Sequence, residues 1–296
     1  MHIVYVSDGK AGHRSQALGL FKAMHKQTNI ELTFEEISID HLPVLSLLTA
    51  YKKQKHAAVS QQPDYIFGVG SHTQLRVLLM GKVFPYAKTV ILMKPNFPLF
   101  WFDHVVIPEH DGVPEQTNVI VTQGALNPIE NEQRHIANRI LIALGGSSKR
   151  HIWNADKVMS AIQQIVQQNM QCDIILTSSR RTPADFLPAV AQQSFASQLQ
   201  IFPVEETPQG WIFEEMQKAE VVWVTEDSVS MIYEALTAGC KVGLIQIDRA
   251  KEDRITRSIQ HLIDQKLVSN ARQIAELYST AAFKEAERVA NRLLGK

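Results

Sequence analysis

Three polar turns in the second half of the sequence carry the side chains best suited to holding an anion. They read GGSSKR at 145–150, TSSRRTP at 177–183 and TEDS at 225–228. Glycine turns and helix N-termini present free N–H groups, and paired arginines offer planar, bidentate donors, which together suit a phosphate. We therefore expect an anion site made of Gly145, Gly146, Ser147, Ser178, Arg180, Arg181, Asp227 and Ser228.

The same turns also have purely structural interpretations. Asp227 or Ser228 would serve equally as the cap of a helix starting near Val229, and 177–183 as a solvated charged loop. The phosphate site is the favoured interpretation, because each of the three turns follows a strand-like run. The turns should therefore meet at the carboxyl ends of parallel strands, where ligands bind. Replacing Arg180 and Arg181 by Ala is then expected to weaken ligand binding and spare the fold, since charged loop residues seldom support a core.

A further polar turn, SDGKAGH at 7–13, lies near the N-terminus between a strand and a helix. Its Asp8 and His13 are candidates for the general base of a reaction, because the ordinary pKa of His is close to neutral pH. A His in such a loop is also a common surface or capping residue. The spacing is not that of a P-loop, which requires GxxxxGK[ST].

Strand-like apolar runs alternate with helical periodicity along the whole chain. We expect strands at 2–6, 31–39, 64–70, 89–93, 104–107, 119–121, 139–144, 173–176, 199–203, 221–224 and 241–246. Further helices are expected at 212–219, 252–262 and 274–294, the last with Phe283, Ala286, Ala290 and Leu293 on one face. The polar stretch 123–138 separates two such series. The prediction is an α/β protein of two Rossmann-like domains facing a cleft, at 1–125 and 126–296, with the last helix packing back on the first domain.

Composition excludes several classes of function. With 30 basic and 30 acidic side chains among 296 residues, the chain lacks the charge for nonspecific nucleic-acid binding. Its longest apolar stretches are strand-sized and no signal peptide precedes the first strand, so we expect a cytoplasmic protein without a transmembrane segment. Cys172 and Cys240 are too few for a disulfide framework, and the 11 histidines show no metal-binding spacing.

Five segments carry a resemblance to a known family. DGKAGH at 8–13, GVGSHT at 68–73, ALGGSSKRHIW at 143–153, TSSRRTP at 177–183 and TEDSVSMIYEA at 225–235 resemble the mitochondrial-fission Elm-type family. More distantly, the layout is similar to GT-B glycosyltransferases, especially the lipid-intermediate N-acetylglucosaminyltransferase type. Those have two Rossmann-like domains, a glycine-rich first loop ending in His, and a GGS loop in the second domain; the first loop here differs in carrying Lys10 at its centre.

The resemblance implies a glycosyltransferase that uses a nucleotide-diphosphate sugar, in envelope or surface glycan synthesis. In such an enzyme the second domain holds the nucleotide and Glu234 accepts hydrogen bonds from the ribose, whereas without the resemblance Glu234 is an exposed helical residue. The pyrophosphate would lie over the Gly145–Ser148 turn without a metal or other cofactor, and Arg180 or Arg181 would offset its charge. The implied partners are the nucleotide sugar, an acceptor that the sequence does not name, and a peripheral membrane contact.

Two other functions fit the same fold. The plant members, which act in organelle division, suggest a non-catalytic binding or scaffold protein. A sugar-nucleotide epimerase would cleave the donor and add the sugar back. Binding of a sugar nucleotide with slow release of nucleoside diphosphate would favour transfer.

Overall fold

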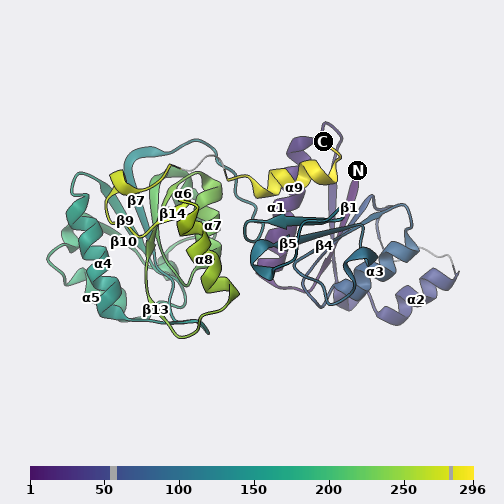
Figure 1. Ribbon diagram of the computed structural model, residues 1–296, viewed down its shortest axis with the longest axis horizontal. Coiled ribbons are helices and arrows are strands. Elements are labelled where there is room, and N and C mark those ends of the chain that lie inside the picture. The colour runs from purple at the N-terminus through teal and green to yellow at the C-terminus, as the bar shows by residue number, and fades with distance from the viewer. Residues whose placement is uncertain (54–58, 280–282) are drawn as a thin grey trace. The chain divides into compact units, whose positions relative to one another are not determined.

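The chain forms two compact units in the computed structural model, which describes residues 1–53, 59–279 and 283–296 (Figure 1). The first unit comprises Met1–Pro128 together with Lys284–Lys296, and the second comprises Ile129–Phe283. Each unit is built on its own parallel sheet.

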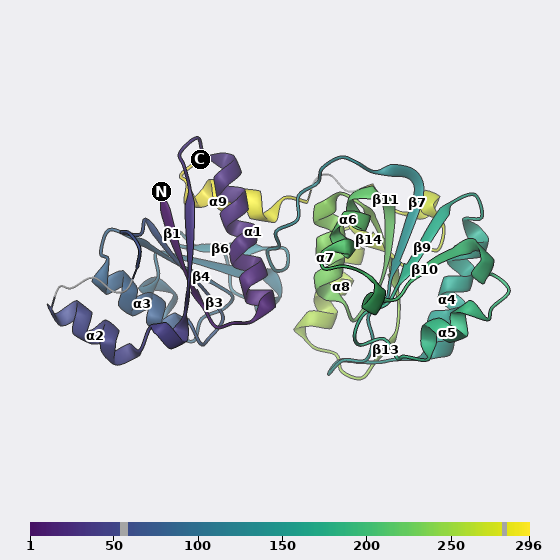
Figure 2. The same ribbon diagram turned by 180° about the vertical axis from the view of Figure 1, so that it is seen from behind.

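The first unit has a six-stranded parallel sheet in the order β2-β1-β3-β4-β5-β6. Its strands are β1 (His2–Ser7), β2 (Thr33–Ser38), β3 (Tyr65–Val69), β4 (Lys88–Leu92), β5 (His104–Pro108) and β6 (Val119–Thr122). Helices α1 (Ala11–Gln27) and α9 (Glu285–Leu293) cover one face, and α2 (Val44–Lys53) and α3 (Gln74–Val83) cover the other (Figure 2). Burial on both faces explains why β1 is an unbroken buried run rather than an alternating one.

The second unit repeats this architecture, with the strand order β10-β9-β7-β11-β12-β14, all parallel. Its strands are β7 (Ile136–Ala143), β9 (Asp173–Thr177), β10 (Leu199–Phe202), β11 (Ala219–Thr225), β12 (Lys241–Ile245) and β14 (Val268–Ser269). Helices α4 (Ala155–Gln168) and α5 (Phe186–Ala191) pack on one face; α6 (Trp211–Lys218), α7 (Val229–Ala238) and α8 (Arg254–Asp264) pack on the other. A separate antiparallel pair joins β8 (His151–Ile152) to β13 (Asp248–Arg249).

Strand β11 occupies the interior of this second sheet, between β7 and β12. Its Trp223 is fully buried and donates a hydrogen bond from Nε1 to the Ala271 carbonyl at 2.9 Å. The ring lies against Gly243 of β12, where an added Cβ would come within 2.2 Å of the indole nitrogen. The predicted α/β class with two Rossmann-like sheets is confirmed.

The predicted helix at 274–294 is wrong in its first half. Ile274–Glu276 is one 3-10 turn, Leu277 is extended, and α9 begins only at Glu285; residues 280–282 lie outside the described residues. Leu277 and Phe283 are buried in the second unit, whereas Val289 and Leu293 are buried in the first. The segment passes from one core to the other, so a continuous helical stripe cannot form even though the apolar spacing suggests one.

Candidate functional site

The three polar turns of the second unit meet at one edge of its sheet. Strands β9, β7 and β11 are neighbours, so their carboxyl ends bring the turns that follow them together. The Gly145 N–H donates to Thr225 Oγ1 at 2.6 Å, and the Gly146 N–H donates to Asp227 Oδ2 at 3.0 Å. The turn after β7 is thus fastened by side chains of the turn after β11.

Arg181 closes this cluster from the turn after β9. Its guanidinium forms an ion pair with Asp227 Oδ2 at 2.6 Å and donates to Ser228 Oγ at 3.0 Å. The same group also donates to the carbonyls of Gly146 and Ser147, each at 3.4 Å. The Asp227 side chain is 0% exposed, and its Oδ1 is buried without a hydrogen-bond partner among the described residues.

Both glycines are required by close approach. A Cβ on Gly145 would lie 2.2 Å from Asp227 Oδ2, and a Cβ on Gly146 would lie 1.9 Å from the Arg181 carbonyl oxygen. The second obstacle is backbone, which cannot move aside as a flexible side chain can. The glycine pair is therefore what lets the turn after β9 lie directly on the turn after β7.

Helix α7 begins at this edge without a side-chain cap. Ser228 occupies the N-cap position but neither it nor Asp227 accepts a capping hydrogen bond, so the capping interpretation of these residues is wrong. The Asp227 carboxylate instead faces Gly146 and Arg181. The first-turn N–H groups of α7 remain available to another acceptor.

A pocket of about 850 Å³ opens beside the cluster. Its lining includes Ser178, Arg180, Arg181, Glu205, Trp211 and Met231. Ser178 Oγ accepts the Val204 N–H at 3.0 Å, so it fixes the pocket wall rather than pointing freely into the space. Arg180 is exposed and makes no hydrogen bond or ion pair with any described residue, which leaves its guanidinium free for a ligand.

Ser147 takes a supporting position. Its Oγ accepts the Trp153 N–H at 3.1 Å, which closes the loop between β7 and β8. The predicted anion-site residues therefore divide into a central group, Gly145, Gly146, Arg181, Asp227 and Ser228, and a flanking group, Ser147, Ser178 and Arg180.

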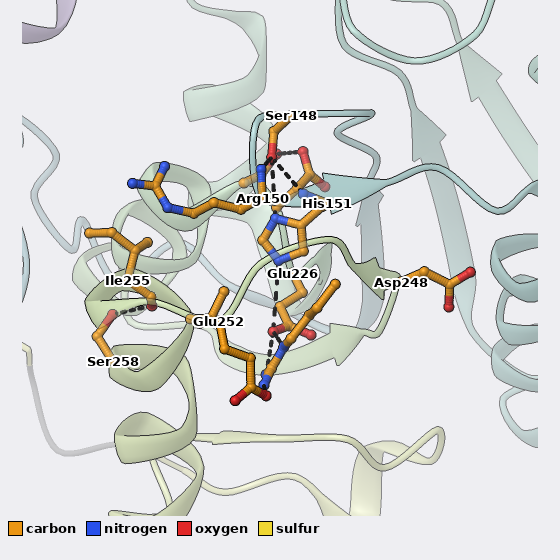
Figure 3. Close-up of polar contacts among 12 residues, drawn as sticks. Ser148, Arg150, His151, Glu226, Asp248, Glu252, Ile255 and Ser258 are labelled. Atoms are coloured by element: carbon orange, nitrogen blue, oxygen red, sulfur yellow. Dashed lines mark hydrogen bonds and ion pairs between the residues drawn. The ribbon is translucent and has the colours of Figure 1, made fainter.

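Sequence reasoning missed a buried polar cluster behind this loop, drawn in Figure 3. His151 Nδ1 lies 3.3 Å from Ser148 Oγ, and its Nε2 lies 3.9 Å from Glu226 Oε1. Arg249 Nε donates to the same Glu226 oxygen at 2.6 Å. Burial lowers the pKa of His151 below its ordinary value, although Glu226 opposes that shift. The cluster holds the loop after β7 against β13, and the two-residue strands β8 and β13 are too short to show periodicity.

Glu234 lies in α7, about one turn beyond the pocket-lining Met231, and is not itself part of the lining. Its carboxyl is mostly buried and has no hydrogen-bond partner among the described residues. Burial raises its pKa from 4.5 to about 7. The interpretation of Glu234 as an exposed helical residue is therefore wrong.

In the first unit, Asp8 and His13 form a pair. His13 Nδ1 lies 3.0 Å from the Asp8 carboxylate, and Lys10 Nζ lies 3.1 Å from Asp8 Oδ2. Burial alone would raise the pKa of Asp8, but the hydrogen bonds from Lys10 and His13 outweigh it and hold the pKa below its ordinary value. The imidazole ring lies against Gly70, where a Cβ would come within 2.5 Å of Cε1. Because a carboxylate can only accept, the hydrogen bond to Asp8 favours the proton on Nδ1, and in the neutral ring Nε2 is then the basic nitrogen.

Within residues 1–53, 59–279 and 283–296, no three His, Cys, Asp or Glu side chains are grouped so as to hold a metal ion. Within the same ranges, no helix combines the length and the apolar character needed to cross a membrane.

Solved structures share this fold over nearly the whole chain. MurG of Acinetobacter baumannii is 15% identical, with a TM-score of 0.51 over 99% of this chain and 89% of its own. The UDP-GlcNAc 2-epimerase of Methanocaldococcus jannaschii is 12% identical, with a TM-score of 0.52 over 100% of both chains. A putative UDP-N-acetylglucosamine 2-epimerase of Listeria monocytogenes is 12% identical, with a TM-score of 0.54 over 99% of this chain and 94% of its own. At these identities the likeness establishes the fold alone.

Sequence comparison identifies the family. The uncharacterized protein RP120 of Rickettsia prowazekii is 23% identical over 98% of this chain and 97% of its own length. The model of the mitochondrial fission ELM1 family matches residues 11–296, a range that holds all three polar turns of the second unit and His13, but begins after Asp8 and Lys10. The chain therefore belongs to the mitochondrial fission ELM1 family.

Proposed function

We propose that this protein is a GT-B-type glycosyltransferase that binds a nucleotide-diphosphate sugar in its second unit. The observation that carries the proposal is the pocket at the carboxyl edge of the second sheet. It is lined by Arg180, which has no polar partner among the described residues, and by Arg181, which also contacts the glycine turn, and the uncapped start of α7 lies at the same edge. An unpaired guanidinium and free helix N–H groups are complementary to a diphosphate. The pocket also presents Trp211, whose ring offers a surface for a base. A structure of similar fold, S. aureus MnaA with a TM-score of 0.50, carries UDP.

The chemistry divides between the two units. In the second unit Arg180 offsets the charge that grows on the diphosphate as the bond from the anomeric carbon to its oxygen breaks. In the first unit His13 Nε2 removes the proton of the acceptor hydroxyl, whose oxygen forms the new bond to the anomeric carbon. Asp8 acts as a positioning residue, because it holds the proton on Nδ1. We propose no metal or other cofactor, and the nucleotide sugar is the substrate.

Stabilisation by nucleotide tests this function directly. We expect UDP or ADP to raise the midpoint of thermal unfolding, since a ligand at 100 times its Kd adds about 2.7 kcal/mol of stability. Glucose and inorganic sulfate at the same concentration serve as controls for unspecific effects. Absence of a shift with every nucleoside diphosphate would favour a scaffold role.

A second candidate function is a sugar-nucleotide epimerase, because two of the proteins with a similar fold are named as UDP-N-acetylglucosamine 2-epimerases. An epimerase would return the sugar to the diphosphate with an inverted carbon, whereas a transferase releases nucleoside diphosphate, slowly when water takes the place of the acceptor. Incubation with UDP-GlcNAc, followed by mass spectrometry and proton NMR of the nucleotide sugar, separates the two. A changed configuration at C2 with UDP still attached would replace our proposal.

Replacing His13 with Asn should abolish most turnover and leave the nucleotide site intact. Loss of a general base lowers rates by about 10²–10⁴-fold, and His13 belongs to the first unit whereas the nucleotide pocket belongs to the second. The measurement is release of nucleoside diphosphate alongside calorimetric binding of UDP. Asp8→Asn is the companion variant, and we expect it to change the pH profile of turnover rather than UDP affinity. A His13→Asn protein with parental turnover would remove His13 from the reaction.

We also propose a peripheral membrane contact on the first unit, with the protein on the cytoplasmic side. Tyr86, Phe100 and Trp101 are 85%, 80% and 52% exposed, and the exposed Lys82 and Lys88 lie on neighbouring segments. Trp101 and Lys82 line one depression of about 860 Å³. Exposed aromatic side chains beside lysines are complementary to an anionic lipid surface, and such a surface would place a lipid-borne acceptor near the enzyme.

Vesicle sedimentation tests this contact. We expect binding to vesicles containing phosphatidylglycerol to fall about tenfold or more in Phe100→Ser/Trp101→Ser, since the variant loses the two exposed rings that would be buried in the lipid surface. Phe213→Ser, which alters a 37% exposed aromatic of the second unit, is the matched control. Equal binding by all three proteins would show that the membrane, if bound, is bound elsewhere.

A further inference from the structure

The anion-binding edge of the second unit is already occupied by a carboxylate of the protein itself. Asp227 Oδ2 accepts the Gly146 N–H at 3.0 Å and pairs with Arg181 at 2.6 Å. These two donors, a glycine-turn amide and a guanidinium, are the ones that a phosphate would take at this place.

The carboxylate is held tightly and incompletely satisfied. Its side chain is 0% exposed. A Cβ on Gly145 would lie 2.2 Å from Asp227 Oδ2 and 2.5 Å from Oδ1, so the glycine leaves the room that the carboxylate fills. Oδ1 is buried with no hydrogen-bond partner among the described residues. Asp227 also leaves the start of α7 uncapped, although it lies next to it.

From this geometry we infer that Asp227 acts as an internal competitor of the ligand's diphosphate, so that the Asp227–Arg181 pair must open before Arg181 and Gly146 can hold the phosphates. The inference rests on the proposed nucleotide-binding function and concerns how that site discriminates. A diphosphate next to an ionised Asp227 would meet like-charge repulsion inside a buried setting. The pair therefore weakens binding of every anion and makes it depend on what the rest of the ligand contributes through the pocket.

This role is opposite in sign to that of a residue that holds the ligand. If Asp227 were a direct ligand contact, removing its charge would weaken binding. If it competes, Asp227→Asn frees Arg181 and strengthens binding. The gain lies at the phosphates, so it should be the same for a nucleotide and for a diphosphate that lacks a base.

Calorimetric titration of the full chain with UDP and with inorganic pyrophosphate tests the inference. We expect Asp227→Asn to bind both probes at least about tenfold more tightly than the parent, because one charge-assisted contact is freed. Glu206→Gln removes one negative charge from an exposed residue that is not part of the pocket lining, and we expect it to change affinity little. Asp227→Ser, which is neutral and too short to reach Arg181, carries the same expectation as Asp227→Asn should the latter not fold.

The outcomes separate this inference from the function on which it rests. Parental or weaker binding by the Asp227 variants, with UDP still bound by the parent, overturns the competition and leaves the nucleotide site standing. An equal gain in Glu206→Gln also overturns it, since the loss of any nearby negative charge would then explain the tighter binding. If neither probe binds any of the proteins, the proposed function fails, and the competition fails with it.

Discussion

Arg181→Ala should lower the free energy of unfolding of the second unit by roughly 2–4 kcal/mol, because it leaves the buried Asp227 carboxylate without its cation. The side chain of Arg181 is 43% exposed while that of Asp227 is 0% exposed, so the loss arises mainly from the stranded carboxylate. The sequence-based expectation that both arginines can be removed without harm to the fold is therefore revised for Arg181. Urea unfolding followed by tryptophan fluorescence is the measurement, since Trp153, Trp211 and Trp223 all lie in the second unit.

The neighbouring arginine supplies the control. Arg180 is exposed and unpaired among the described residues, so Arg180→Ala should change stability by no more than about 0.5 kcal/mol. Asp227→Asn combined with Arg181→Ala should recover most of the lost stability, since the double variant buries no unpaired charge. Equal stability of the two arginine variants would show that the ion pair contributes nothing to the fold.

The strand–helix–strand core of the second unit was predictable because local signals agree there. Val221–Val224 is apolar and β-branched, the following helix has regular apolar spacing, and Gly239 ends it in the left-handed conformation at φ 90°. The shared sheet edge then follows from parallel topology alone.

Other features depended on contacts that no local pattern contains. Arg181 and Asp227 lie in different turns, and only the side-chain packing shows that they pair instead of both facing a ligand. Strands β8 and β13 have two residues each, so their pairing reflects the buried Glu226 cluster rather than propensity. Likewise, the C-terminal segment keeps helical spacing through Leu277, yet its apolar residues are buried in two different cores, one in each unit.

Glu234→Gln should stabilise the protein above neutral pH and have little effect in acid. The pKa of Glu234 is raised from 4.5 to about 7, so the folded protein holds this proton more strongly than the unfolded chain does. The stability of the parent therefore falls as the pH rises from about 4.5 to about 7 and is constant above that, whereas Gln has no charge to bury. The difference should grow from near zero at pH 4 to roughly 2–3 kcal/mol at pH 8. Urea unfolding at both pH values measures it, with Glu205→Gln as the exposed control.

The Glu234→Gln variant also tests whether the Glu234 carboxylate accepts hydrogen bonds from a ribose. Two hydroxyl donors would offset the burial of an ionised Glu234, and a partnerless acid beside a pocket is what such a contact requires before the ligand arrives. We expect Glu234→Gln to lose about 1–3 kcal/mol of binding free energy for UDP at pH 8. Its loss for 2′-deoxy-UDP, which the parent should already bind weakly, should be clearly smaller. Calorimetric titration of both nucleotides into both proteins gives the comparison. Equal losses for the two nucleotides would show that Glu234 does not contact the ribose, and its raised pKa would then reflect only its packing within α7.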